Sequence, residues 1–403
     1  MPAILPTPAR GLVAAGMLLV AATTAVAKPP PPWEFHDGDR IVFVGDTFVE
    51  REQRYGYVET VLTLANPEKN LTFRNLGWSG DTVRGLSRAG FDPPEAGFRE
   101  LIKQVTDAKP TVLVVGYGMA ESFDGAAALP RFVKGYNAFL DAIAPLKARL
   151  VLLSPLPHEA MAPPLPDPAA HNRDLAAYAE AIGSIAASRD AAFVDLFSLV
   201  GKARARREEQ PTLPAPDTDN GIHPTELGFW RLANMPEMGV KPGAYMPSKD
   251  LKTTEQGVRF AVADSRLPLP ASPATGKSLD GVRSIRVEKL KPGRYTLKVD
   301  GRKVVTKTAQ EWAKGQALPA GPEAEQVEKL RATIVAKNRL FFYRWRPQNI
   351  TYLFGFRKHE QGRNAVEIPQ FDPLVDAKEK EIAALRKPVQ HTFELVRESE
   401  ASR

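Results

Sequence analysis

Short apolar runs recur along the first half of the chain, each ending in glycine or a small polar residue. The first is Ile-Val-Phe-Val at 41–44, which Gly45 and Asp46 end and Thr47 follows. Such a run is typical of a parallel strand covered on both faces. Thr47 is therefore expected just outside the carboxyl end of a strand, where open α/β sheets bind ligands, or it is simply a turn threonine that caps a helix. Further strands of this kind are predicted at 71–75, 111–115, 150–153 and 192–196.

Apolar positions between these runs recur at helical spacing instead. Helices are predicted at 55–64, 96–105, 132–143 and 172–187, and one more at 226–232. Strands that alternate with helices favour an α/β fold with a doubly wound parallel sheet and right-handed crossovers. Each strand end carries glycine or small polar residues, as the ligand-binding edge of such a sheet would.

The alternation stops after residue 241. Segments 284–288, 295–299 and 303–306 alternate with period two, and Asp300-Gly301 is typical of a two-residue hairpin turn. We expect a domain at 28–245, followed by a small antiparallel β unit at 246–320.

The last segment, 321–403, is predicted to be a helical, aromatic and basic region. A helix is expected at 322–338, and an exposed charged helix at 377–386. Between them, 340–346 and 352–356 mix aromatic and basic residues. This mixture favours an amphipathic hairpin with its aromatic side chains in a core, and the alternative is a surface that stacks on sugars or bases.

The N-terminal segment, the cysteine content and the net charge indicate where the protein is located and which partners it favours. Arg10, an uncharged apolar run at 11–22 and Ala25-Val26-Ala27 form the pattern of a secretory signal at 1–27, so we expect a periplasmic or secreted protein with no stable membrane anchor. The sequence has no cysteine, which excludes disulfides and thiolate metal sites. The formal charge of +7 favours acidic partners, but export makes nucleic acid an unfavoured partner.

Two histidines are candidates for chemistry. The polar loop at 217–224 carries His223 just before a predicted helix, which places this ring near the same sheet edge as Thr47. His158 lies in a proline-rich segment and is expected to be a solvated loop residue. No spacing of histidine and carboxylate residues indicates a metal site, and no cofactor is expected.

Four blocks in order resemble the SGNH or GDSL-like hydrolases, which are esterases and lipases on a flavodoxin-like sheet. The resemblance covers about 40–233 and implies roles for matching residues. Thr47 stands at the nucleophile position, Gly80 and Ala120 stand at the oxyanion-hole positions, and Asn220 and His223 stand at the Asp and His positions of the triad. The blocks are Gly45-Asp46-Thr47, Ser79-Gly80-Asp81-Thr82, Gly118-Met119-Ala120-Glu121 and Asn220-Gly221-Ile222-His223.

Three of these positions depart from the family pattern. Thr47 replaces serine and adds a methyl group that restricts χ1. Ala120 replaces asparagine and has no donor for an oxyanion. Asn220 replaces the carboxylate that orients the histidine. The alternative carboxylate for orienting His223 is that of the neighbouring Asp219. Glu121 and Ser122 are further polar groups beside the missing asparagine.

The resemblance therefore implies an ester hydrolase that acts on a small-molecule or glycan ester, for example by removing acetyl groups from glycans. The substitutions imply slow turnover by a Thr47–His223 variant of the serine esterase mechanism. The alternative is a catalytically impaired protein on the same fold that binds glycans or has a structural role.

Overall fold

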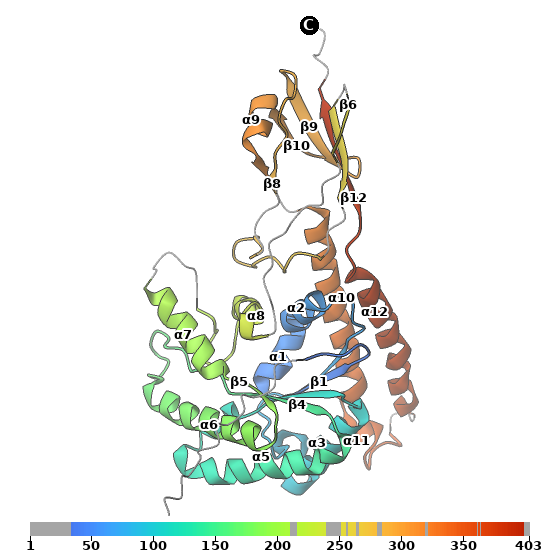
Figure 1. Ribbon diagram of the computed structural model, residues 1–403. Helices are drawn as coiled ribbons and strands as arrows, with labels where there is room; N and C mark the ends of the chain where they lie inside the picture. The colour runs from blue at the N-terminus through green and yellow to red at the C-terminus, as the bar shows by residue number, and fades with distance from the viewer. Residues whose placement is uncertain are drawn as a thin grey trace, which may run out of the picture.

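The computed structural model describes residues 34–209, 216–238, 251–254, 257–262, 266–279, 284–318, 321–360, 362 and 364–398. The predicted secretory signal at 1–27 lies outside these residues. Two five-stranded sheets, one parallel and one antiparallel, organise the described part of the chain (Figure 1). No helix in the described ranges combines the length and apolar character needed to cross a membrane.

The parallel sheet has five strands in the order β2-β1-β3-β4-β5. Every neighbouring pair is parallel, and the glycines that end β1 and β3, Gly45 and Gly116, lie side by side. All five predicted strands are present. Their bounds are β1 Arg40–Gly45, β2 Thr72–Gly77, β3 Val112–Gly116, β4 Arg149–Leu153 and β5 Ala192–Val194.

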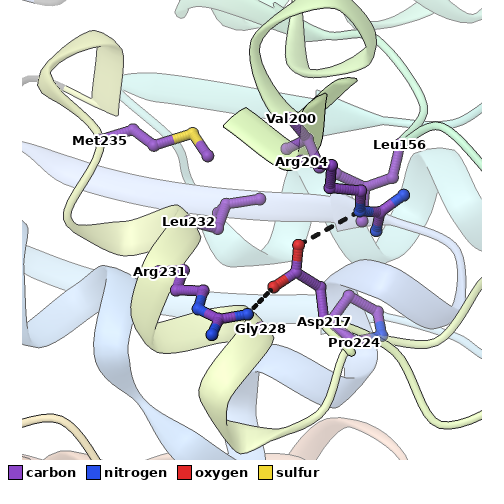
Figure 2. Close-up of a pocket in the computed structure, with 9 residues that line it drawn as sticks. All are labelled: Leu156, Val200, Arg204, Asp217, Pro224, Gly228, Arg231, Leu232 and Met235. Carbon is purple, nitrogen blue, oxygen red and sulfur yellow. Dashed lines mark hydrogen bonds and ion pairs between the residues drawn. The ribbon is translucent and has the colours of Figure 1, made fainter. Parts of the chain in front are cut away.

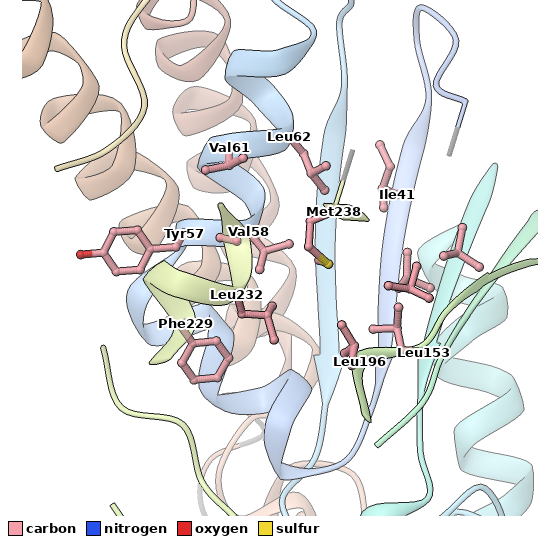
Figure 3. Close-up of a cluster of buried hydrophobic side chains, with 14 of the residues drawn as sticks. Ile41, Tyr57, Val58, Val61, Leu62, Leu153, Leu196, Phe229, Leu232 and Met238 are labelled. Atoms are coloured by element: carbon pink, nitrogen blue, oxygen red, sulfur yellow. The ribbon is translucent and has the colours of Figure 1, made fainter. Parts of the chain in front are cut away.

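Successive residues of β1 face opposite sides of this sheet, as the pleat requires. Ile41 belongs to the apolar cluster in Figure 3, with side chains such as Val58 and Phe229. Val42 and Val44 belong to the cluster on the other face. Helices cover both faces, so the predicted doubly wound α/β fold is confirmed. The helices are α1 Thr47–Tyr55, α2 Tyr57–Ala65, α3 Pro94–Ala108, α4 Met119–Ser122, α5 Leu129–Ile143, α6 Ala169–Ser188, α7 Leu196–Glu208 and α8 Glu226–Ala233.

The antiparallel sheet has the strand order β10-β9-β12-β7-β6 and a core of its own around Trp312. The hairpin predicted at Asp300-Gly301 joins β9 to β10, and both residues have positive φ, 47° and 79°. The central strand β12 comes from far along the chain, after two long helices. The elements of this part of the chain are β6 Leu251–Thr254, β7 Gly257–Val262, β8 Ser284–Ile285, β9 Arg294–Val299, β10 Arg302–Thr308, α9 Ala309–Lys314, β11 Gln316–Ala317 and β12 His391–Arg397, and β8 and β11 pair in a separate two-stranded sheet.

Helices α10 (Pro322–Trp345) and α12 (Phe371–Leu385) pack against each other, and α10 also contacts α1, α2 and β2 (Figure 1). The buried ammonium of Lys337 on α10 contacts Glu59 Oε1 at 2.6 Å and donates to the carbonyl oxygen of Phe73 at 3.0 Å. The two predicted helices in this segment are therefore present, and both lie on the parallel-sheet domain. The division into 28–245, 246–320 and 321–403 stays a prediction.

The amphipathic hairpin predicted from 340–346 and 352–356 is wrong, because residues 340–345 form the last turns of α10 and Arg346 is its C-cap. Phe341 and Trp345, four residues apart, both pack against the core on the α3 and α5 side of the parallel sheet. Their spacing fits a helical face as well as a strand. The helical form is the one present, because these residues continue α10, whose earlier turns pack in a separate cluster with Leu64 and Ile382. The second aromatic segment, 352–356, begins within the short helix α11 (Ile350–Leu353).

Candidate active site

Thr47 is the first residue of α1, directly after β1. Asp46 caps this helix, because its Oδ1 accepts a hydrogen bond from the Phe48 N–H at 3.0 Å. Burial raises the pKa of Asp46 to about 8, and the nearby Glu121 carboxylate adds to this increase. Strand, cap and helix together hold the threonine hydroxyl at the carboxyl edge of the sheet, where the sequence predicts it.

Gly80 lies in the turn that follows β2 and has a φ of 70°. The Asp81 N–H donates to the Trp78 carbonyl at 3.0 Å and closes this turn. Glycine accommodates the positive φ without steric cost. In this conformation the Gly80 N–H donates to Thr47 Oγ1 at 3.0 Å. The amide that the family resemblance assigns to oxyanion binding therefore faces the hydroxyl assigned to attack.

Ala120 lies on α4 and lines the same cavity as Thr47, but its methyl group offers no donor. The neighbouring Glu121 carboxylate accepts from the N–H groups of Val83 at 2.8 Å and Gly118 at 3.0 Å, so it joins the loop after β3 to the loop after β2. Burial raises the pKa of Glu121 to about 7. Glu121 thus fixes backbone around the site and does not replace the missing asparagine.

The loop that carries His223 is held tightly at its base. Thr218 and Pro224 form an isolated antiparallel bridge, and the Asp219 N–H donates to the His223 carbonyl at 3.0 Å. The Asp217 carboxylate contacts Arg231 at 2.5 Å and Arg204 at 3.1 Å (Figure 2). The cavity drawn there is about 10 Å³, which is far too small for a substrate. Asp217 therefore anchors the loop.

Asn220 fixes the tautomer of His223. Its Oδ1 accepts from the N–H groups of Ile222 at 3.2 Å and His223 at 2.9 Å, which identifies the oxygen of the amide. Its Nδ2 then lies 3.0 Å from His223 Nδ1. Because an amide nitrogen only donates, Nδ1 is the acceptor and the proton of the neutral ring is on Nε2. This tautomer is opposite to the one that an aspartate at this position stabilises.

Asp219 does not take over the role of that aspartate. Its Oδ1 lies 4.0 Å from His223 Nδ1, beyond hydrogen-bond reach, while its Oδ2 pairs with the Arg51 guanidinium at 2.7 Å. Burial lowers the pKa of His223, the positive charge of Arg51 lowers it further, and Asp219 only partly opposes them. The imidazole is therefore neutral at pH 7.

One cavity of about 310 Å³ lies at this edge of the sheet, and neither Asn220 nor Asp219 is among the residues that line it. Thr47 and Gly80 lie on its wall with Ala120 and His223, so the structure brings these predicted residues together. Within the described residues, no hydrogen bond joins Thr47 Oγ1 to the His223 ring. The apolar part of the wall includes Phe48, Tyr117, Met119, Phe123, Pro155, Leu156 and Ile222.

His158 lies in a loop, as predicted, but its side chain is half-buried instead of fully solvated. Its Nδ1 lies 3.1 Å from His171 Nδ1, and His171 Nε2 lies 2.7 Å from Ser122 Oγ. Burial lowers the pKa of both rings. No sequence pattern indicates His171, because it lies inside a helix and meets His158 only through the fold.

Comparisons with known proteins bear on the family and the fold. Residues 38–231 match the model of the GDSL-like Lipase/Acylhydrolase family. A solved structure described as a gut microbial diltiazem-metabolizing enzyme has a similar fold, with 17% identity and a TM-score of 0.67 over 92% of this chain and 100% of that one. An acetylxylan esterase from Geobacillus stearothermophilus gives 23% identity and a TM-score of 0.37 over 51% of this chain and 96% of that one. No curated protein sequence matches.

Proposed function

We propose that this protein, whose residues 38–231 belong to the GDSL-like lipase/acylhydrolase family, hydrolyses carboxylic esters in the cavity between Thr47 and His223. The observation that carries the proposal is the 3.0 Å hydrogen bond from the Gly80 N–H to Thr47 Oγ1. It places a hydroxyl and a backbone donor beside each other on the wall that His223 also lines.

In the proposed reaction Thr47 Oγ1 attacks the ester carbonyl and transfers its proton to His223 Nε2. The Gly80 N–H then stabilises the oxyanion, the alcohol leaves with the proton from His223, and water hydrolyses the acyl-threonine by the same steps. His223 Nε2 accepts a proton only when Nδ1 carries one. Asn220 stabilises the other tautomer, so each turnover requires the disfavoured form of the ring. This requirement makes slow turnover the expected behaviour.

Export and glycan esters are the finer parts of the proposal. Export rests on the pattern at 1–27, and glycan esters rest on the exposed aromatic residues near the basic end of α10. Phe354 and Phe356 are 55% and 86% exposed, and they replace Trp345, which packs inward, as candidates for contact with a sugar. Aromatic faces that are open to solvent are the usual platform for sugar rings.

A catalytically silent glycan-binding protein is the second candidate. The contact between Asn220 Nδ2 and His223 Nδ1 favours it, because it leaves Nε2 protonated and unable to act as a base. The two candidates share the fold and the cavity, and only turnover separates them.

The experiment measures hydrolysis of p-nitrophenyl acetate, p-nitrophenyl butyrate and an acetylated xylo-oligosaccharide by purified protein. We expect His223→Ala and Thr47→Ala to abolish turnover, while His359→Ala, which changes an exposed histidine, keeps it. Equal rates in wild type and His223→Ala would contradict ester hydrolysis. Glycan recognition would be supported if Thr47→Ala still binds the oligosaccharide and the Phe354→Ala, Phe356→Ala double variant does not.

A further inference from the structure

The end of α10 reaches the loop that carries Gly80, although the two lie more than 260 positions apart in the sequence. The Arg346 guanidinium lies over the Trp78 ring, with its carbon 3.7 Å from the ring centroid. The Trp345 ring meets the same indole edge-on at 5.8 Å. Trp78 precedes Gly80 by two residues and closes its turn through the Asp81 N–H.

A second contact links Arg346 to this loop through a carboxylate. Arg346 Nη1 donates to Glu50 Oε2 at 2.9 Å, and the same oxygen accepts from the Ser79 N–H at 2.5 Å. The ion pair is largely shielded from water, with 24% of the Arg346 side chain and 10% of the Glu50 side chain exposed. Partial burial strengthens a charge-assisted bond and fixes its geometry more than an exposed pair would.

These contacts act on the side of the turn that precedes Gly80. Glu50 holds the amide of Ser79, which precedes Gly80, and the stacking on Trp78 holds the residue before that. The other side of the turn is held by buried Asp81, which pairs with Arg88 at 2.7 Å, and the Arg88 guanidinium in turn lies 5.7 Å from the centroid of the Trp345 ring. The contacts that Arg346 and Trp345 make with Trp78, Glu50 and Arg88 all come from the C-terminal part of the chain.

We propose that Arg346, supported by Trp345, is a positioning residue that holds the Ser79–Gly80 peptide so that the Gly80 N–H faces Thr47 Oγ1. The α10 helix is then part of the machinery of the site without touching the substrate. This inference rests on the proposed function for its kinetic consequence, but the position of the loop is measurable without turnover.

The test compares Arg346→Ala with Arg346→Lys and with Arg344→Ala. Arg344 lies on the same helix end but pairs with Asp372 near the surface, so it is the matched control. Hydrogen exchange of a peptide covering 76–85 reports the loop, and kcat and KM on the ester report the chemistry. We expect Arg346→Ala to speed exchange of the Ser79 and Gly80 amides about tenfold and to lower kcat about tenfold, with KM changed less than about threefold.

Arg346→Lys keeps the charge for Glu50 but loses the flat stacking on Trp78, so it should recover part of kcat. Arg344→Ala should match wild type in both measurements. If Arg346→Ala does not fold, Glu50→Gln breaks the ion pair from the other side and serves as the second variant.

Exchange in Arg346→Ala equal to that in Arg344→Ala would overturn the proposal. Faster exchange with unchanged kcat, in a protein whose His223→Ala variant is inactive, would also overturn it. If wild type and His223→Ala hydrolyse the ester equally, the proposed function fails, and the exchange measurement alone decides whether Arg346 positions the loop.

Discussion

The two sides of the cavity differ in how far they keep the chemistry of an ester hydrolase. On the Thr47 side, a hydroxyl and the Gly80 N–H meet at 3.0 Å, and the loop behind them is fixed by Glu50 and Asp81. On the His223 side the loop is held as firmly, by Asp217 and its arginines. On this side, however, the His223 ring contacts the side-chain amide of Asn220, at the position where the family has a carboxylate.

This difference shows that the catalytic side chain at position 220 departs from the family pattern while the backbone that carries it stays firmly held. The His223 loop keeps its anchor, its bridge and its hydrogen bonds, and one side-chain atom sets the unfavourable tautomer. A site held this firmly should recover activity when that atom is restored, because no backbone has to move.

The largest expected effect comes from Asn220→Asp. The carboxylate still accepts from the Ile222 and His223 N–H groups, and its other oxygen accepts from a protonated Nδ1, which frees Nε2 to act as a base. We expect kcat to rise about 10²–10³-fold, by analogy with the roughly 10⁴-fold loss that the reverse change causes in a serine protease. Ester hydrolysis measured at pH 8 tests this expectation. A rate for Asn220→Asp that stays at the wild-type value would contradict the view that the side chain at position 220 alone limits activity. A loss of kcat above tenfold in Asp219→Asn would identify Asp219 as the carboxylate that orients His223.

The next effect concerns Ala120→Asn on the oxyanion side. A side-chain amide on α4 would supply the second donor that the cavity lacks, and one such donor is typically worth about 10²–10³ in kcat. We expect a gain of about tenfold or more, visible in kcat more than in KM. Ala120→Leu is the matched control, because it fills space without a donor, and it should slow the reaction. An equal gain in both variants would show that packing, rather than a hydrogen bond, limits this side.

The anchor of the His223 loop is tested by Asp217→Asn. Burial alone would raise the pKa of Asp217, but Arg231, Arg207 and Arg204 lower it below its usual value. A lowered carboxyl pKa stabilises the fold above the unfolded-state pKa near 3.8, and this stabilisation is lost as pH falls through the folded-state pKa.

We therefore expect Asp217→Asn to lower the free energy of unfolding by about 3 kcal/mol at pH 7, and the deficit to vanish in acid. Urea unfolding at several pH values measures it. Asp141→Asn removes an exposed partner of Arg189 and should change stability by less than about 0.5 kcal/mol. Equal deficits in the two variants would contradict the anchoring role.

The smallest effect is a shift of the pH profile. The lowered pKa of His223 places the acid limb of kcat/KM below pH 6.5 in wild type, because activity requires the neutral ring. A carboxylate at position 220 favours the imidazolium, so Asn220→Asp should move this limb upward by about one pH unit. Rates measured between pH 4.5 and 8 test both statements. A wild-type limb above pH 7 would contradict the effect assigned to burial and Arg51.

Sequence patterns predict the parallel sheet well, because its strands are short, buried and separated by helices of ordinary length. The same patterns place Thr47, Gly80, Ala120 and His223 at one edge, since strand ends meet there. They do not predict how the Asn220 amide is oriented, which depends on two backbone N–H groups in a loop.

The C-terminal part resists prediction for a different reason. Phe341 and Trp345 have a spacing that fits more than one structure, and the fold decides between them through a core that lies elsewhere in the chain. The contact of Arg346 with Trp78 and Glu50 is likewise invisible in the sequence, because nothing local to either segment indicates the other.

The position of β12 between β9 and β7 bears on the order of events during synthesis. The ribosome makes β6, β7, β9 and β10 first, and these strands pair only as two hairpins that are marginally stable alone. Each hairpin presents an unpaired edge until β12 emerges after α10 and α12. The antiparallel sheet is therefore completed last. Until β12 is made, after α10 has already been synthesised, the unpaired edges of the two hairpins are open to pairing with strands of neighbouring chains.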